Sequence, residues 1–356
     1  MRADRTAGED PTVRADLTRS TERPGKAVFR RAGAQDREGI LAVSSRHPDD
    51  WIPYVIDQAL AAELGGFFVA EEGGEIVACC AASAAGEEAW LGAMRVAPEF
   101  GGRGLATGLT AYVLEACRGW GCRVARLSTA VTNGPARSVV ERKLGFRTVG
   151  RWVWREVTFA QALEPGPLVG LLRAHGRRDE GVRKARQTDT EGVLAFIRDR
   201  AAAGLLAPGG LVADPDDPWE LWTLTAARLQ RYLCPPAAVL VREEGRGRTS
   251  GVALLGSEAP HEGSSGAHST LVVALLEGGP GPTLDLLASA VECGLQAGAT
   301  RLLLALPGSE HDVLTALLGT DRPRAEWVLE TVIYEKDLGR GDGPDGGITG
   351  PAREGL

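Results

Sequence analysis

Three closely spaced glycines and the segment after them carry the clearest chemical signal in the sequence. Gly101, Gly102 and Gly104 follow a strand-like run, and apolar residues at helical spacing extend from Leu105 to Trp120. Glycine lets the backbone turn tightly and approach a ligand closely, and a helix start presents N–H groups and a positive dipole end. The pattern predicts a diphosphate site without the Lys-Ser/Thr pair of a Walker loop.

A second segment strengthens this interpretation. Asn133 to Phe146 (NGPARSVVERKLGF) follows the helix and a predicted strand at Val124 to Ala130. Together with Val96 to Leu109 (VAPEFGGRGLATGL), it resembles the GCN5-related N-acetyltransferases, the GNAT family, over residues 28–157. The resemblance implies an α/β (α+β) fold with a mixed, mostly antiparallel twisted sheet flanked by helices. A splayed strand pair in that fold holds acyl-CoA.

The match to the family's acyl-CoA loop, Gln/Arg-x-x-Gly-x-Gly/Ala, is incomplete. Gly104 and Ala106 match its last two fixed positions, whereas Gly101 stands at the first, so one side chain is missing. Cofactor bonds in that loop are mostly main-chain, so we expect weaker binding and not its loss. The second segment matches the family's Asn-x-x-Ala…Leu-Gly-Phe helix at Asn133, Ala136, Leu144, Gly145 and Phe146.

The resemblance implies acetyl-CoA as co-substrate and assigns residues to it. The backbone of Met94, Arg95 and Val96 would pair with the pantetheine arm, as a peptide adds to a sheet edge. Asn133 and Arg137 would lie near the thioester arm or the nucleotide. The diphosphate would contact Gly101, Gly102, Arg103, Gly104, Leu105, Ala106 and Thr107.

Family chemistry is direct attack of a neutral amine on the thioester, with the Val96 N–H stabilising the oxyanion. Many members protonate the leaving thiolate with a Tyr on the Asn133 helix. That Tyr is missing: counting from Asn133 gives Val140, counting back from Phe146 gives Glu141, and the segment is one residue longer than usual. A thiol has a pKa of about 8.5, so activity is expected to survive, with Glu141 as a candidate acid.

The amine also needs a base, since an alkyl amine has a pKa of about 10.4. Glu87 and Glu88, at the start of the strand through Leu91, are candidates, and turn carboxylates in solvent are the alternative. An aromatic and acidic cluster suits a cationic amine, although a helix cap with a core aromatic would look the same. The predicted acceptor region is Asp49, Asp50, Trp51 and Tyr54.

The chain also contains an internal repeat. Arg30 to Ala42 (RRAGAQDREGILA) and Arg183 to Ala195 (RKARQTDTEGVLA) are identical at seven of thirteen positions. A second match lies further on: Gly278 to Gly281 precedes an amphipathic segment, as Glu99 to Gly104 does in the first copy. The segment between the two matches is longer in the second copy, and part of the extra length lies in Leu206 to Trp219. Duplication explains two matches in the same order.

The second copy looks degenerate. Pro280 and Pro282 remove two N–H donors from its loop, and nothing in Ala305 to Leu318 resembles the Asn helix. We expect a GNAT-like scaffold without cofactor, packed on the first copy as a pseudo-dimer. The predicted organisation is an arm (1–27), an active domain (28–163), a linker (164–181), a degenerate domain (182–338) and a tail (339–356).

Composition excludes several classes. A net charge of −7 and a pI of about 5.5 argue against nucleic acid and suit an amine substrate. No apolar run is long enough for a membrane span, and the polar start is unlike a signal peptide. The six cysteines show neither metal-ligand spacing nor a disulfide framework, which predicts reduced thiols, no metal and a cytoplasmic protein.

Three functions therefore stay open. The first is an N-acetyltransferase for a primary amine of a small molecule or peptide, either a monomer built as a pseudo-dimer or a weak homodimer. The second is a non-catalytic acyl-CoA sensor, favoured by the missing Tyr and the missing Gln/Arg. The third is a protein lysine or N-terminal acetyltransferase, which would need an open groove where the first needs a closed pocket.

Overall fold

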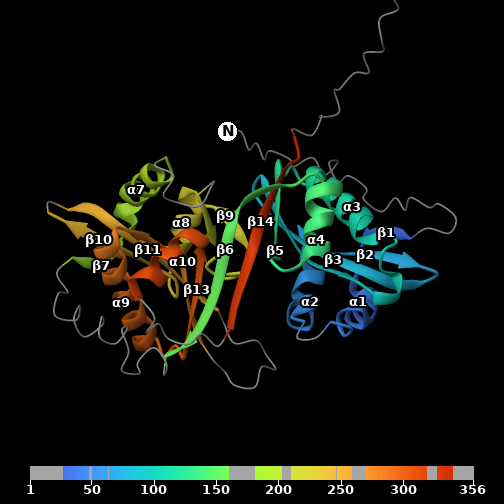
Figure 1. Cartoon of the computed structure of the whole chain (residues 1–356), viewed down its shortest axis with the longest axis horizontal. Coiled ribbons are helices and arrows are strands. Elements are labelled where there is room, and N and C mark those ends of the chain that lie inside the picture. Colours follow the sequence, from blue (N-terminus) through green and yellow to red (C-terminus); the bar gives the residue numbers. More distant parts are fainter. Residues whose placement is uncertain are drawn as a thin grey trace, which may run out of the picture. The chain divides into compact units, whose positions relative to one another are not determined.

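The structure is a computed structural model in which the packing divides the chain into two compact units. Unit 1 comprises residues 1–125 and 337–356, and unit 2 comprises residues 126–336. The predicted arm, linker and tail fall almost entirely outside the described residues. Those described are residues 27–47, 50–62, 64–159, 181–202, 210–245, 247–258, 269–318 and 327–339 (Figure 1).

Unit 1 contains four antiparallel strands in the order β1-β2-β3-β4. Gly73 and Gly74 form the turn between β2 and β3 with φ of 61° and 85°, which glycine adopts without strain. The apolar stretches at 67–71 and 76–82 lie within β2 and β3. The bounds are β1 Val28–Arg31, β2 Gly65–Glu72, β3 Glu75–Ala85 and β4 Glu88–Val96.

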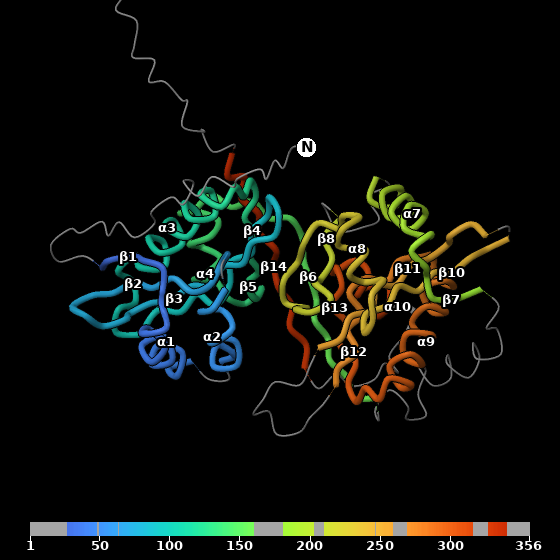
Figure 2. The backbone as a smooth tube through the Cα atoms, turned by 180° about the vertical axis from the view of Figure 1, so that it is seen from behind, coloured from blue at the N-terminus to red at the C-terminus, as the bar shows by residue number. Residues whose placement is uncertain are grey.

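Helices cover both faces of these strands (Figure 2). Ile40 of α1 and Ile52 of α2 pack with Val69 of β2. Phe68 points to the opposite face and meets Tyr112 of α3, with ring centroids 6.2 Å apart. The bounds are η1 Ala34–Asp36, α1 Arg37–Ser44, α2 Ile52–Ala61, η2 Pro98–Phe100 and α3 Leu105–Gly119.

Unit 2 has the strand order β5-β14-β6-β13-β12-β11-β10-β7, with β5 (Val124–Ala130) starting in unit 1. The mapped pairs are antiparallel except β12 and β13, which are parallel. The mostly antiparallel α/β fold is as predicted. The strands are β6 Arg147–Thr158, β7 Val182–Lys184, β10 Ala238–Glu244, β11 Arg248–Glu258, β12 Thr270–Gly278, β13 Arg301–Pro307 and β14 Trp327–Asp337.

The last strands of the two sequence copies are exchanged. β6 belongs to the first copy, yet it lies between β13 and β14 of the second and is antiparallel to both. β14, from the second copy, lies between β5 and β6 of the first. The division between compact units therefore falls inside the first copy. The predicted domain boundaries at residues 163 and 182 stay predictions.

The extra length of the second copy contains a small two-stranded sheet, β8 and β9. Trp219 in its turn stacks between Trp154 of β6 and Trp327 of β14, with ring centroids 5.7 and 5.6 Å apart. The Trp154 indole also donates to Pro218 O at 3.0 Å, so this insertion is fixed to both exchanged strands. The remaining elements are β8 Leu211–Ala213, β9 Leu221–Thr223, α4 Gly134–Ser138, η3 Val139–Lys143, η4 Gln187–Asp189, α7 Thr190–Ala202, α8 Ala226–Tyr232, α9 Pro280–Gln296 and α10 Gly308–Leu318.

The repeat is visible as one ionic arrangement built twice. In unit 1, Arg30 binds Asp36 through two hydrogen bonds of 2.6 and 2.7 Å and also binds Glu71 of β2 at 2.7 Å. The Gly33 N–H donates to the same carboxylate at 2.8 Å. The guanidinium of Arg30 therefore lowers the pKa of Asp36.

Unit 2 repeats the arrangement with equivalent residues. Arg183 binds Asp189 at 2.7 and 3.0 Å and Glu243 of β10 at 2.6 Å, and the Arg186 N–H donates to Asp189 at 2.7 Å. The hydrogen bonds from Arg183 lower the pKa of Asp189 to about 2. Each arrangement fixes the first strand of a copy to the start of its first helix.

Asp36→Asn should lower the free energy of unfolding at pH 7 by about 1.5–3 kcal/mol, because it removes a charged hydrogen-bond acceptor. The folded pKa of Asp36 is lowered, so this stabilisation is present above the unfolded pKa of about 3.9 and is lost as the pH falls through the folded value. Urea unfolding should therefore show parent and variant converging at low pH. Glu38→Gln, at an exposed pair, is the control; an equal loss there would contradict the prediction.

Candidate active site

The pairing of β4 with β3 is interrupted near its end. Cys79 is opposite Arg95, but Ala81 is opposite Gly92, so β4 carries one extra residue between these pairs. Within this bulge Ala93 has φ of 50°, a left-handed conformation that is uncommon for a residue other than glycine. Bulges often lie beside active sites, and this one precedes the residues predicted to pair with pantetheine.

The other edge of β4 faces β5, its neighbour in the sheet, and the hydrogen bonds to β3 show which groups at the end of β4 turn toward that edge. The Ala97 N–H donates to Val77 O at 2.9 Å, so these two residues form a hydrogen-bonded pair. Pair types alternate in an antiparallel ladder, so the neighbouring pair, Ala78 and Val96, is not hydrogen-bonded. The Val96 N–H therefore points away from β3. This orientation suits its predicted role as oxyanion donor.

The glycine loop turns the chain from β4 into α3. Gly102 and Gly104 have φ of 73° and 81°, a region that glycine adopts without steric cost. Gly101 has ordinary φ, but a Cβ there would lie 3.0 Å from Pro98 O, a tight contact. This crowding gives a physical reason for glycine where the family has Gln or Arg.

The start of α3 leaves main-chain donors open. Its first hydrogen bond joins the Gly108 N–H to Gly104 O at 2.9 Å. The N–H groups of residues 104–107 consequently have no acceptor inside the helix, and they lie at the positive end of its dipole. No side chain caps this start, so the N–H groups can bind an oxyanion such as a phosphate.

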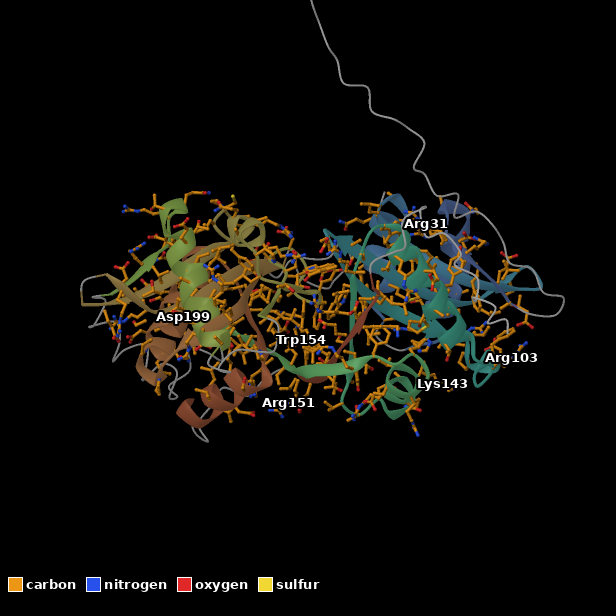
Figure 3. The ribbon with its side chains drawn as sticks, turned by 90° about the horizontal axis from the view of Figure 1, so that it is seen from above. Arg31, Arg103, Lys143, Arg151, Trp154 and Asp199 are labelled. Atoms are coloured by element: carbon orange, nitrogen blue, oxygen red, sulfur yellow. The ribbon has the colours of Figure 1, made fainter. Side chains whose placement is uncertain are left out.

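Arg103 adds a positive charge to the loop and lies at the edge of its unit (Figure 3). It binds Glu72 of β2 at 2.6 Å, and its guanidinium lies over the Phe100 ring at 5.2 Å. The pair is partly exposed and contributes about 0–1 kcal/mol, so it can exchange for a phosphate at little cost. Cofactor binding by Arg103 stays a prediction.

The predicted acceptor residues have different surroundings. Asp50 binds Arg95 of β4 through two hydrogen bonds of 2.9 and 3.0 Å and accepts another from Ser44 at 2.9 Å. Its side chain is only 3% exposed, so it holds Arg95 and is not available to a cationic substrate. Trp51 and Tyr54, at the start of α2, are 44% and 51% exposed. Asp49 lies outside the described residues.

The structure does not bring Glu88 to the glycine loop. Glu88 is the first residue of β4 and Val96 is the last, so at 3.3 Å per residue they are about 26 Å apart. Glu87 forms an ion pair with Arg123 at 3.0 Å. Neither carboxylate lies near the bulge.

In unit 2, the Asn133 segment has an unusual helical form. The Asn133 side chain accepts a hydrogen bond from the Ala136 N–H at 3.2 Å and caps α4. The following five residues, η3, form a π-helix turn. A π turn accommodates one extra residue in a helix, which explains why this segment is one residue longer than the family spacing.

Arg137 and Glu141 of this segment both contact Tyr334 of β14. The Tyr334 hydroxyl donates to Glu141 Oε1 at 2.5 Å and accepts from Arg137 Nε at 3.1 Å, while Arg137 also donates to Val131 O. The hydrogen bond from Tyr334 lowers the pKa of Glu141. Glu141 is therefore ionised at neutral pH, which does not suit the acid role considered for it.

Sequence reasoning missed Tyr334. It lies 193 residues from Glu141 and belongs to no motif. The one sequence feature that pointed to it was that the Asn133 segment lacks a Tyr while the chain contains only four tyrosines. Finding it required the strand order, which the sequence pattern does not supply.

The corresponding helix of the second copy, α9, starts differently. Pro280 and Pro282 occupy its first turn, and the Thr283 N–H donates to Gly279 O at 3.0 Å. Proline has no N–H, so this start offers fewer donors than α3, as predicted.

Among the described residues, no group of three or more His, Cys, Asp or Glu side chains is arranged for a metal ion. No described helix is long and apolar enough to span a membrane.

Comparison with known proteins agrees with this geometry. Residues 35–146 match the sequence profile of the acetyltransferase (GNAT) family. No curated protein matches the chain in sequence.

Solved structures share the fold. A GCN5-related N-acetyltransferase from Sphaerobacter thermophilus has a TM-score of 0.55 and 15% identity over 88% of this chain and 96% of its own. A glucosamine N-acetyltransferase region of a fungal β-N-acetylglucosaminidase has a TM-score of 0.56 and 15% identity, over 88% and 38%. A tandem GNAT protein from the clavulanic acid biosynthesis pathway has a TM-score of 0.50 and 13% identity, over 89% and 100%. Identities this low show the fold alone.

Gly104→Ala should lower stability more than Gly281→Ala does. A Cβ at either position meets no residue beyond its chain neighbours within 4 Å, so the backbone conformation decides the effect. Gly104 has positive φ, where alanine costs about 1–2 kcal/mol, whereas Gly281 lies in α9 without positive φ and escapes that cost. Urea unfolding measures both, and an unchanged Gly104→Ala variant would contradict the assigned loop conformation.

Proposed function

The chain belongs to the GNAT family of acetyltransferases through residues 35–146, and on this premise we propose that it transfers an acetyl group from acetyl-CoA to a primary amine of a small molecule or peptide. The observation that carries the proposal is the set of open N–H groups at the start of α3. They follow directly on β4, whose last residue, Val96, points its N–H away from β3. Both features fit a ligand with a diphosphate and an amide-containing arm.

The residues present fit acetyl-CoA in two places. The N–H groups of residues 104–107 would bind the diphosphate oxygens, assisted by the helix dipole. The outer edge of Met94 to Val96 would pair with the pantetheine amides, as an added strand does. Asn133 and Arg137 of unit 2 stay predicted contacts of the same ligand.

Acetyl-CoA supplies the acyl group already activated as a thioester. The contribution of the protein to the reaction would be electrostatic. The Val96 N–H would donate a hydrogen bond to the thioester carbonyl oxygen as negative charge develops there. Because this donor is held by the strand and does not need to reorganise, it lowers the barrier more than a water molecule would.

The acceptor side would be formed by the start of α2. Trp51 and Tyr54 expose ring surface, and ring faces attract ammonium and alkylammonium groups. The Asp50–Arg95 pair ties the residue preceding Trp51 to β4, so it would hold the aromatic side chains near the strand. In this proposal Asp50 would position Trp51 and Tyr54 and would not bind the amine itself.

Ala106→Pro tests the diphosphate site. Ala106 lies in the first turn of α3, where proline is tolerated, so the change removes one N–H with little effect on the fold. Loss of one hydrogen bond to a charged group, about 1.5–3 kcal/mol, should weaken acetyl-CoA binding roughly 10- to 150-fold in calorimetry. Ala106→Ser keeps the N–H and should bind like the parent. Equal binding by all three proteins would contradict the site.

Turnover separates the enzyme from a sensor. Thiol release from acetyl-CoA, followed with a panel of primary amines and lysine peptides, should depend on at least one amine. Trp51→Ala should raise KM for that amine while leaving acetyl-CoA affinity unchanged, with the exposed Val328→Ala as control. Tight binding of acetyl-CoA without turnover of any amine would favour the non-catalytic sensor.

A further inference from the structure

The side chain of Glu310, in the first turn of α10, is buried in an unusual way. Glu310 is only 7% exposed, and within the described residues neither of its carboxyl oxygens has a hydrogen-bond partner. An ionised carboxylate in this position would lose its hydration without gaining donors in return, which is costly. Glu310 therefore fits this position as the neutral acid.

Glu310 lies where two strands of unit 2 part. The mapped pairs of β12 with β13 run from Thr270 to Val273, whereas its pairs with β11 continue to Gly278. The helix α10 begins directly after β13, and its Glu310 carboxyl is close enough to Glu277 of β12 for their charges to interact. The carboxyl of Glu310 therefore lies between the end of β13 and the end of β12.

The cation that acts on Glu310, Arg200 of α7, is already bound. Its Nε donates to Glu277 Oε1 at 2.5 Å, and its Nη2 donates to Gly278 O at 3.3 Å. The Glu277 side chain is 3% exposed, so its carboxylate depends on this partner. Arg200 cannot serve Glu310 without leaving Glu277 as an unpaired buried charge.

The other charged groups on α10 and on the strands packed against it, β6 and β13, have partners of their own. Arginines of the strands bind acids or the histidine next to Glu310. The contacts are Arg151 with Asp312 and Glu330, Arg155 with His311, and Arg301 with Glu156.

The two carboxyls differ in protonation. Burial raises the pKa of Glu310 well above its ordinary value, and the charge of Glu277 raises it further. Burial also raises the pKa of Glu277, but its ion pair and hydrogen bond with Arg200 oppose that change. Of the two, Glu310 is therefore the group that keeps a proton.

Unit 1 has an ion pair at the corresponding point, with the charges reversed. In each unit, β4 or β12 has a bulge, and its last residue but one binds an oppositely charged side chain. Arg95 of β4 binds Asp50, and Glu277 of β12 binds Arg200. The second copy places the additional carboxyl of Glu310 beside its pair, so this arrangement is independent of the reaction proposed for the first.

We propose that Glu310 is a proton-dependent closure of the second copy, in which the neutral carboxyl keeps the first turn of α10 against β12. When Glu310 loses its proton to solvent, two carboxylates face each other in a buried space while Arg200 stays bound to Glu277. The ionised side chain then has to turn out to water, and the first turn of α10 moves away from β12 with it.

The pH at which the closure weakens follows from the direction of the shift. Because the folded pKa of Glu310 is raised, its contribution to stability is complete below the ordinary value of about 4.3 and is lost as the pH rises through the folded value. Between these two values, opening releases one proton. The equilibrium constant for opening should therefore rise about tenfold per pH unit.

Hydrogen exchange of the full chain, followed by mass spectrometry, tests the closure. Relative to Glu310→Gln, the parent should show an opening constant for the α10 amides that rises about tenfold per pH unit between pH 5 and 7, after correction for intrinsic exchange. Glutamine keeps the size of the side chain but does not titrate. Glu292→Gln, exposed on α9, and His311→Gln, which removes the titratable neighbour, should keep the slope of the parent.

Glu277→Gln gives a second, opposite test. It removes the negative neighbour and frees Arg200 for Glu310, so the rise in opening should end at a lower pH than in the parent. Equal pH dependence in the parent and Glu310→Gln, or an unchanged profile in Glu277→Gln, would overturn the inference. If Glu310→Gln does not fold, ¹³C NMR of the Glu310 carboxyl carbon in the parent reads its titration directly. A midpoint of about 4.3 would then overturn the inference.

Discussion

The unsatisfied N–H groups at the start of α3 are the constraint on which the candidate site depends. Donors exposed in this way are costly unless water or an anion binds them, and the positive dipole end makes an anion the better partner. Gly102 and Gly104 supply the positive φ values that bring the chain from β4 into this helix. The bulge at Ala93 shifts the register of β4 against β3 shortly before the strand enters this loop.

The exchanged strands make the second copy part of the sheet that the first copy forms. Its α9 begins with prolines and offers fewer main-chain donors than α3. Yet β14 lies between β5 and β6, and without it these two strands of the first copy would lose a neighbour. Trp219, stacked between Trp154 and Trp327, fixes the insertion to the same two strands.

Much of the fold was predictable from the sequence because the local signals are strong. Val124–Ala130 is a strand as predicted, and Arg301–Pro307 is another strand with the same kind of apolar run. The helix at Leu105 was predicted from apolar residues at helical spacing. The repeat was also visible, and its Arg and Asp residues make the same ion pair in both units. Each Arg also pairs with a Glu of a neighbouring strand outside the repeat, Glu71 in unit 1 and Glu243 in unit 2.

The rest depends on contacts between distant segments, which local pattern does not contain. Strand exchange leaves no trace in periodicity, so Tyr334 was not connected with Glu141. Asp50 looked like a ligand for an amine because its partner, Arg95, lies 45 residues away. Ala93 adopts positive φ although alanine gives no sign of it. Each of these features is decided by packing and not by propensity.

The most direct measurement of the central claim is an NMR titration of the main-chain amides. Addition of CoA should shift the N–H resonances of residues 104–107, and pantetheine, which lacks the diphosphate, should leave them in place while still shifting residues 94–96. If CoA binds and the amides of residues 104–107 do not respond, the start of α3 is not the diphosphate site and the assignment of the loop is wrong.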